Sequence, residues 1–509
     1  MFLKSSAIFS ILTFVSRIFG FIRDVLIAAY FGTGVYADAF NIAFKLPNFF
    51  RNIFAEGAFS AAFVPLFSGK LSAEGKKKAI EFAGNILTIL TVILIVLIVL
   101  FEIFMPFVIM GLAPGFEADA HKFNLTVYLT KITTPYLFFI SLVTFYACIL
   151  NSINKFAAMA FSPVILNIAM IAALYYLGNT QTDKVVVAAW AVFVGGLLQL
   201  IFILWPIIRR GVWPSFRFPS FTGDVKKFFK NIIPAVMGSG VTQINLWIGT
   251  IIATTIPGAV SMIYYVDRVV QLPISLIGVS IGIVILPSLS RHFKLKNKEQ
   301  AIHTQNRALE IALLFSLPCT VALFVISEPL IYILFQRGAF KAADTLNTSP
   351  ALVTLAIGIP AYVMNKIMVP AFFAVEDTKT PVKISIVCMI INVTGNLILI
   401  RYLSYVGITL ATAIAAWVNI ILLFVFAYRK EIFKFDKTFK NKSLKIILSS
   451  GFLYVFLEAV SGLCHKYIYC EGWLSLLVFM AVVVGSGLVY FYSLYITSAY
   501  TLEELKELF

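Results

Sequence analysis

Long apolar runs separated by short, mostly basic loops extend along the whole chain. Fourteen of these runs hold about 18 or more residues, enough for a helix to cross roughly 30 Å of hydrocarbon. The pattern therefore predicts an all-α polytopic membrane protein with 14 transmembrane helices. The expected spans are 7–30, 36–66, 82–111, 124–151, 156–177, 185–208, 228–254, 259–289, 303–327, 345–373, 381–401, 405–427, 444–463 and 472–497.

The composition agrees with this pattern. The 509 residues are 60% hydrophobic and 13% charged, whereas a soluble protein is about half apolar and a quarter charged. The first run resembles a signal peptide, but it holds Arg17, Arg23 and Asp24 and no evident cleavage site, so we read it as a retained helix. The scattered cysteines favour no disulfide framework, and a pairing of Cys464 with Cys470 stays open.

The basic residues are distributed unequally between the two sides of the membrane. About 24 Lys and Arg residues lie in loops that follow even-numbered spans, against about 6 in the other loops. The positive-inside rule then predicts that the basic loops and both termini are cytoplasmic. The net charge of +16 is explained by these loops, so we expect no nucleic-acid partner.

Two spans share a proline pattern that indicates an internal repeat. "FKLPNFF" and "FVPLFS" open and close the second span, and "VQLPISL" and "ILPSLS" do the same in the eighth. Such repeats predict two six-helix lobes related by a pseudo-two-fold axis, a transporter architecture with the substrate site between the lobes. The expected domains are 1–220 for spans 1–6, 221–430 for spans 7–12, and 431–509 for two additional C-terminal helices.

Several of the predicted spans carry charged residues. Each costs about 2.5–3.5 kcal/mol near a helix centre even on the lenient insertion scale, so such groups usually face a cavity or pair with one another. If the two lobes face each other, these residues line one central cavity. We therefore expect the substrate-binding residues to be Arg17, Arg23, Arg51, Arg268, Asp24, Asp38, Glu56 and Lys366.

The arginines of this set indicate an anionic ligand. A guanidinium donates two parallel hydrogen bonds to phosphate, so a diphosphate fits best. The alternative is local pairing, as between Arg23 and Asp24, near a membrane surface. Prolines within or near the ends of spans permit kinks, which suit a carrier but also occur in static membrane proteins.

A second polar group lies on the eleventh and twelfth spans. Asn392 and Asn396 are four residues apart and share a helical face, and Thr412 follows on the next span. Their oxygen atoms suit Na⁺ as a coupling ion, and we expect no other cofactor, although hydrogen bonding between helices is the commoner role of such residues.

The charged blocks resemble the MurJ (MviN) lipid II flippase family of bacteria. The longest matching blocks are "SRIFGFIRD" (16–24) and "DAFNIAFKLPNFFRNIFAEGAFSAAFVP" (38–65). Shorter blocks include "APGF" (113–116), "YYVDRVVQLP" (264–273) and "KTPVKI" (379–384). The resemblance extends from the first residues to about residue 430 and weakens over the last two spans.

The resemblance implies the fold of the multidrug/oligosaccharidyl-lipid/polysaccharide (MOP) exporter superfamily. It implies a carrier that moves lipid II, the lipid-linked peptidoglycan precursor, from the inner to the outer leaflet of the cytoplasmic membrane. The essential cavity arginines of the family match Arg17, Arg23, Arg51 and Arg268, and its last two spans form a groove for the lipid tail. We expect a monomer surrounded by membrane lipids.

The resemblance also bears on Na⁺. Some members bind Na⁺ between spans 7, 11 and 12, where Asn392, Asn396 and Thr412 fall. Those members use a carboxylate there that this sequence lacks.

Two other functions were considered. A related MOP exporter could carry another polyprenyl-diphosphate oligosaccharide or a drug, and complementation would distinguish it. A membrane enzyme acting on a polyprenyl diphosphate usually needs clustered carboxylates and a metal, whereas the acidic residues here alternate with arginines. We therefore expect a carrier and not an enzyme. No GxxxxGK[ST] nucleotide-binding motif occurs, which indicates that transport is not driven by ATP.

Overall fold

The computed structural model describes residues 2–53, 59–218, 220, 222–470, 472–501 and 504, with the backbone alone at 2–10, 53, 234–242, 279 and 283. Every regular element in this part of the chain is a helix. The chain divides into two compact units. Unit 1 comprises the residues up to Ser261 together with Arg337–Phe340, and unit 2 comprises Met262–Gln336 and the residues from Lys341 onward.

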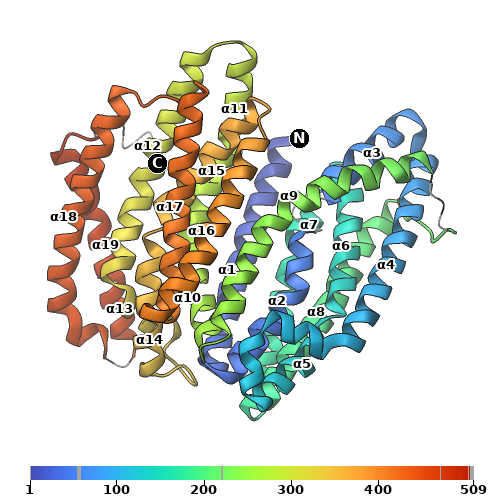
Figure 1. Cartoon of the computed structure of the whole chain (residues 1–509), viewed down its shortest axis with the longest axis horizontal. Helices are drawn as coiled ribbons and strands as arrows, with labels where there is room; N and C mark the ends of the chain where they lie inside the picture. The colour runs from blue at the N-terminus through green and yellow to red at the C-terminus, as the bar shows by residue number, and fades with distance from the viewer. Residues whose placement is uncertain are drawn as a thin grey trace. The chain divides into compact units, whose positions relative to one another are not determined.

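Unit 1 contains nine α-helices and one short 3₁₀ helix within the described residues. Their bounds are α1 Phe2–Phe31, α2 Val35–Ile53, α3 Phe59–Ala73, α4 Gly75–Leu112, η2 Pro114–Ala118, α5 Ala120–Thr133, α6 Tyr136–Ser152, α7 Ala157–Tyr176, α8 Gln181–Arg209 and α9 Gly223–Ala253 (Figure 1). The long apolar helices pack side by side, as α7 does against both α1 and α8.

Unit 2 begins within α10 and is also helical throughout its described residues. Its elements are α10 Ala259–Pro273, the π-helical turn η3 Ile274–Val279, α11 Ser280–Lys294, α12 Lys298–Val325, α13 Ser327–Phe335, α14 Ala342–Ala356, α15 Ile359–Ala374, α16 Lys379–Leu403, α17 Tyr405–Arg429, α18 Lys437–Ile468 and α19 Trp473–Ile496 (Figure 1).

Eleven helical segments of the described chain are long and apolar enough to cross a membrane. Their outer faces are apolar as well: along α4, Ile93, Val96 and Phe107 are all exposed. Such a surface would aggregate in water and suits contact with lipid. The other three expected spans coincide with α1, with α2 and α3, and with α9. The eleven segments are 75–112, 120–152, 157–176, 181–209, 259–294, 298–325, 342–374, 379–403, 405–429, 437–468 and 473–496.

Prolines and a π-turn interrupt several of these segments. The helical geometry of α4 is lost at Phe104, two residues before Pro106, because proline cannot donate the hydrogen bond that would continue the helix. Pro135 separates α5 from α6, and α10 ends at Pro273, where the π-turn begins. These breaks provide places where a helix can bend.

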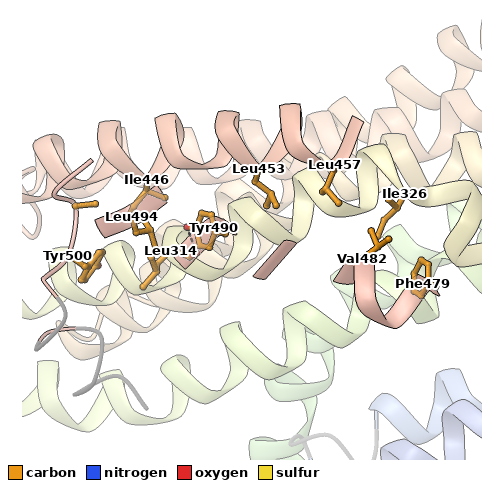
Figure 2. Close-up of a cluster of buried hydrophobic side chains, with 11 residues drawn as sticks. Leu314, Ile326, Ile446, Leu453, Leu457, Phe479, Val482, Tyr490, Leu494 and Tyr500 are labelled. Carbon is orange, nitrogen blue, oxygen red and sulfur yellow. Dashed lines mark hydrogen bonds between the residues drawn. The ribbon is translucent and has the colours of Figure 1, made fainter. Parts of the chain in front are cut away.

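The two C-terminal helices pack against α12. Leu314 on α12, Leu453 and Leu457 on α18, and Tyr490 on α19 belong to one buried apolar cluster (Figure 2). The Tyr490 hydroxyl donates a hydrogen bond to the Leu314 carbonyl at 2.7 Å, so the polar group of this buried side chain has a partner. Close packing and this hydrogen bond hold α18 and α19 on unit 2. In the same region, Cys464 and Cys470 are separate thiols.

Candidate functional site

Arg23 is a predicted cavity arginine whose guanidinium is bound by side chains of two helices. It lies on α1 and is 8% exposed. Its guanidinium donates to Asp24 Oδ1 at 2.7 and 3.0 Å and to Asn167 Oδ1, on α7, at 2.9 Å. The Asn167 amide also donates to the Ser16 carbonyl at 3.2 Å, so this side chain contacts α1 at two positions about two turns apart. The charge is therefore paired and its orientation is fixed, which offsets the cost of burying a guanidinium.

Arg51 lies near the same group of side chains. The Arg23 guanidinium is 5.5 Å from the centre of the Phe44 ring, and the Phe44 and Tyr136 rings are 6.3 Å apart. Arg23 and Arg51 both interact electrostatically with Tyr136. Arg51 is half-buried and donates to Asn48 Oδ1 at 3.1 Å. Arg23 and Asp24 thus lie beside Phe44, and Arg51 lies about two turns further along the same helix, α2.

Arg17 and Lys45 differ from these residues in their surroundings. Arg17 is exposed, one to two turns before Arg23 on α1, and pairs with no charged side chain in the described part of unit 1. Lys45 donates to Thr250 Oγ1 and to the Leu246 carbonyl on α9, and its ammonium lies 5.5 Å from the centre of the Trp247 ring. Of Arg17 and Lys45, Arg17 is therefore the residue whose charged group is open to an incoming anion.

Asp38 lies at the start of α2 and is fully buried. Its carboxylate accepts hydrogen bonds from Lys122 Nζ at 2.7 Å, Gly258 N at 3.0 Å and Ser261 N at 2.8 Å. None of these partners is a predicted cavity arginine. In this conformation Asp38 joins α2, α5 and the start of α10 within unit 1.

Unit 2 places a second charged group on α10. Asp267 and Arg268 are half-buried, and the Arg268 guanidinium lies 4.8 Å from the centre of the Tyr264 ring. Asp267 interacts electrostatically with Tyr362 on α15. Lys366, one turn further along α15, is exposed. Its aliphatic stem lies close to Gly278 of η3: a methyl group added at Gly278 would lie 3.2 Å from Lys366 Cγ.

The three residues expected to bind Na⁺ form a hydrogen-bonded chain in unit 2. Asn396 Nδ2 donates to Asn392 Oδ1 at 3.0 Å, and Asn392 Nδ2 donates to Thr412 Oγ1 at 3.2 Å. Asn396 Oδ1 is buried and has no hydrogen-bond partner among the residues that the structure describes. A buried carbonyl oxygen of this kind suits a hard cation. No cluster of three or more His, Cys, Asp or Glu residues that could hold a metal occurs within the described residues.

Three further points complete the list of predicted residues. Glu56 lies outside the described residues. Sequence reasoning did not identify Asn167 as a partner of Arg23, although an amide in the apolar run 156–177 is the kind of costly residue that signals a polar contact. Lys122 lies in an expected loop between the spans 82–111 and 124–151, and its pairing with Asp38, 84 residues away, has no sequence signal.

Comparison with known proteins gives one consistent result. The model of the family described as "Lipid II flippase MurJ" matches residues 27–483. The chain is 39% identical over 500 residues to a protein of Rickettsia prowazekii (strain Madrid E) named "Probable lipid II flippase MurJ", covering 98% of this chain and 97% of that one. It is likewise 39% identical over 480 residues to a protein of Rhizobium tropici with the same name, covering 92% and 90% of the two chains.

Solved structures agree with the family match. A structure titled "Lipid II flippase MurJ, inward closed conformation" superposes with a TM-score of 0.80 at 29% identity, covering 96% of this chain and 98% of that one. An inward-facing multidrug resistance transporter of the MOP superfamily superposes at 0.69 with 16% identity over 82% and 94% of the two chains, which shows a shared fold. The chain therefore belongs to the lipid II flippase MurJ family, a family of transporters and not of enzymes.

Proposed function

We propose that this protein moves lipid II from the inner to the outer leaflet of the bacterial cytoplasmic membrane by alternating access. The family match over nearly the whole chain supports the substrate. The observation that carries the proposal is the arrangement of Arg23, whose charge is buried on α1 and oriented by both Asp24 and Asn167. The cost of keeping it there is best explained by a bound anion.

The arginines recognise the diphosphate of the substrate. Arg23 and Arg51 provide donors from one side, next to Phe44 and Tyr136, and Arg17 adds a guanidinium that is open to solvent. Arg268 and Lys366, both on unit 2, are the further positive charges of the predicted set. Asp24 orients Arg23 and offsets part of its charge, so that affinity is moderate and the head group can leave. Glu56 and Asp38 complete the predicted set.

The architecture that we propose has fourteen spans. Spans 1–6 and 7–12 form two lobes related by a pseudo-two-fold axis, within residues 1–220 and 221–430. The basic loops and both termini are cytoplasmic, and the protein works as a monomer. The pairs α2 and α3, α5 and α6, α10 and α11, and α14 and α15 each account for one span, which supports this count.

Residues 431–509 form a groove for the polyprenyl tail. The inner faces of α18 and α19 pack against α12, while Leu448, Phe452 and Val484 on these helices remain exposed and apolar. The tail stays in contact with such side chains while the head group passes through the arginine cavity. Leaving the tail in an apolar environment avoids the cost of moving it through a polar cavity.

The membrane potential favours transport in the outward direction. Moving about two net negative charges outward across about 100 mV is favourable by roughly 4–5 kcal/mol. The return of the empty cationic cavity needs its own driving force. We propose Na⁺ for that step, held by oxygen atoms of Asn392, Asn396 and Thr412, with the unpaired Asn396 Oδ1 as one ligand. Tyr362 donates to the Thr412 carbonyl at 3.3 Å and interacts with Asp267, which connects the Na⁺ residues to α10.

Depletion and rescue test the proposal. The native lipid II flippase of a tractable bacterium is replaced by this chain, and lipid II in the outer leaflet and cell lysis are measured. Rescue by the wild type but not by Arg51→Ala supports both the substrate and the site. Failure of a well-expressed, membrane-inserted wild type would favour a MOP exporter of another polyprenyl-diphosphate oligosaccharide.

A further inference from the structure

Unit 2 contains a pocket of about 540 Å³ that is separate from the residues discussed above. It lies where three loops meet: the loop from α11 to α12, the loop from α15 to α16, and the loop from α17 to α18. Lys296, Lys298 and Lys430 line it, together with Asp377 and Glu431. All three loops follow even-numbered spans, so the pocket opens on the basic side of the protein.

Buried amides fix one wall of this pocket. Gln305 Nε2 on α12 donates to the Ile432 carbonyl at 3.2 Å, and Asn306 Nδ2 donates to the Lys434 carbonyl at 2.8 Å. Both side chains are completely or almost completely buried. The loop that carries Lys430 and Glu431 is therefore held in place before any ligand arrives, which lowers the entropic cost of binding.

The three lysines differ in how strongly they are already paired. Lys430 donates to Asp377 and, at 2.9 Å, to Thr380 Oγ1, and Asp377 also accepts from Thr380 N and Oγ1. Lys298 pairs with Glu431 at 2.7 Å, but the Glu431 side chain is 75% exposed and can turn into water. Lys296 is exposed and has no ion-pair partner among the side chains that the structure describes. Two ammonium groups are thus available to an incoming anion.

The backbone conformation of two of these residues is unusual. Lys296 and Glu431 have φ values of 57° and 55°, in the left-handed region where glycine is the least strained residue. Both positions follow the end of a helix, where glycine is also the commonest choice. Strained residues of this kind cluster at functional sites. The presence of charged residues instead of glycine at both positions therefore points to a role for these side chains at the pocket.

We propose that this pocket binds the phosphate group of an anionic phospholipid from the cytoplasmic leaflet. The phosphate contacts Lys296 and takes the place of Glu431 at Lys298, while Phe293 and Ile432 offer an apolar wall to the glycerol end of the lipid. Basic pockets between membrane helices on the cytoplasmic side bind such head groups. The inference depends on the orientation given under Proposed function and concerns lipid binding away from the transport cavity.

The test measures lipid binding and not transport. The full chain is purified in detergent and titrated with dioctanoyl phosphatidylglycerol, with dioctanoyl phosphatidylcholine as the zwitterionic control, and bound lipid is counted by native mass spectrometry. Lys296→Gln/Lys298→Gln should weaken phosphatidylglycerol binding by about 30-fold, since each neutralised lysine removes roughly a fivefold factor. Glu431→Gln should strengthen binding by about fivefold, because Lys298 is released.

The matched control is Lys437→Gln/Lys440→Gln, which removes the same charge from exposed positions on α18 outside the pocket. Equal weakening by both pairs, or no strengthening by Glu431→Gln, would overturn the proposal. Inorganic phosphate distinguishes the source of the ligand: displacement of the lipid by phosphate supports recognition of the phosphate group alone, and retention supports recognition of the phospholipid. Because lipid II transport is assayed separately, loss of this site leaves the proposed function untouched.

Discussion

Lys122 and Asp38 form an ion pair that is almost completely removed from solvent. Lys122 Nζ lies 2.7 Å from Asp38 Oδ2, and the side chains are 7% and 0% exposed. The Lys122 ammonium also lies 4.0 Å from the centre of the Phe116 ring. With the amides of Gly258 and Ser261 on the same carboxylate, the pair connects α5 and α2 to the start of α10 in unit 1.

Removing the lysine should destabilise the protein strongly. Lys122→Ala leaves the Asp38 charge buried with only two amide donors, and breaking a buried pair in this way costs about 3–5 kcal/mol. The midpoint of thermal unfolding in detergent measures the effect. The control is Lys131→Ala, an exposed lysine on the same helix. Equal midpoints for the two variants would show that the pair contributes nothing to stability.

Asn167→Ala should impair transport while the protein stays folded. In our account Asn167 does not contact the ligand but orients the Arg23 guanidinium. A small displacement of such a positioned group lowers the rate strongly. We expect about a tenfold lower rate of lipid II translocation in proteoliposomes, while the unfolding free energy falls by only about 1 kcal/mol. Asn167→Asp, which keeps an acceptor for Arg23, should recover part of the rate. A normal rate for Asn167→Ala would contradict the positioning role.

These two cases show what the sequence could and could not predict. Charges inside apolar runs predicted Arg23, Asp24 and Arg51 as site residues, because the cost of burying a charge is a local property of the sequence. The partners Asn167 and Lys122 lie 144 and 84 residues from the groups that they contact. No local pattern encodes such a distance, so they emerged only from the packing of α7 and α5.

Apolar length predicted most of the helices but not their internal breaks. The π-turn Ile274–Val279 follows Pro273, and the proline suggested a kink without indicating its type. The pocket in unit 2 could not be predicted from the sequence either. Loop charges predict the orientation of the chain in the membrane, but they do not indicate which loops meet in space.

Gly338→Ala should destabilise unit 1 through a short loop. Gly338 lies in Arg337–Phe340, has a φ of 60°, and an added methyl group would come within 2.2 Å of the Ala29 carbonyl oxygen on α1. The next residue, Ala339, donates its amide to that oxygen at 2.7 Å. Left-handed strain and the clash together should cost about 1–3 kcal/mol in unfolding free energy.

The control for this variant is Gly451→Ala on α18, where nothing lies within 4 Å of the added methyl group. Because alanine is the better helix former, we expect it to be neutral or stabilising by about 1 kcal/mol. If Gly338→Ala unfolds at the same temperature as Gly451→Ala, the loop is not held as the structure indicates.

The Asp377–Lys430 pair should give a defined pH dependence. Burial alone would raise the pKa of Asp377, but hydrogen bonds from Lys430 and Thr380 outweigh it and lower the pKa from 3.8 to about 2. A carboxyl with a lowered pKa in the folded state stabilises the protein above its unfolded pKa and loses that contribution as the pH falls towards the folded value.

The difference in unfolding temperature between the wild type and Asp377→Asn should therefore be constant from pH 8 to about pH 5 and shrink as the pH falls from about 4 towards 2. Thermal scans at several pH values measure it. A difference that stays the same down to pH 3 would mean that the Asp377 carboxyl is not stabilised by Lys430.

The central claim is that arginines at membrane depth bind the diphosphate of lipid II. The most direct measurement is translocation of fluorescent lipid II in proteoliposomes by the wild type, by Arg23→Ala/Arg51→Ala, and by Arg209→Ala/Arg210→Ala, which removes equal charge from a basic loop. We predict transport by the wild type and the loop variant and at least a hundredfold loss in the cavity variant, about 3 kcal/mol of transition-state stabilisation. Transport by the cavity variant at the wild-type rate would contradict the account.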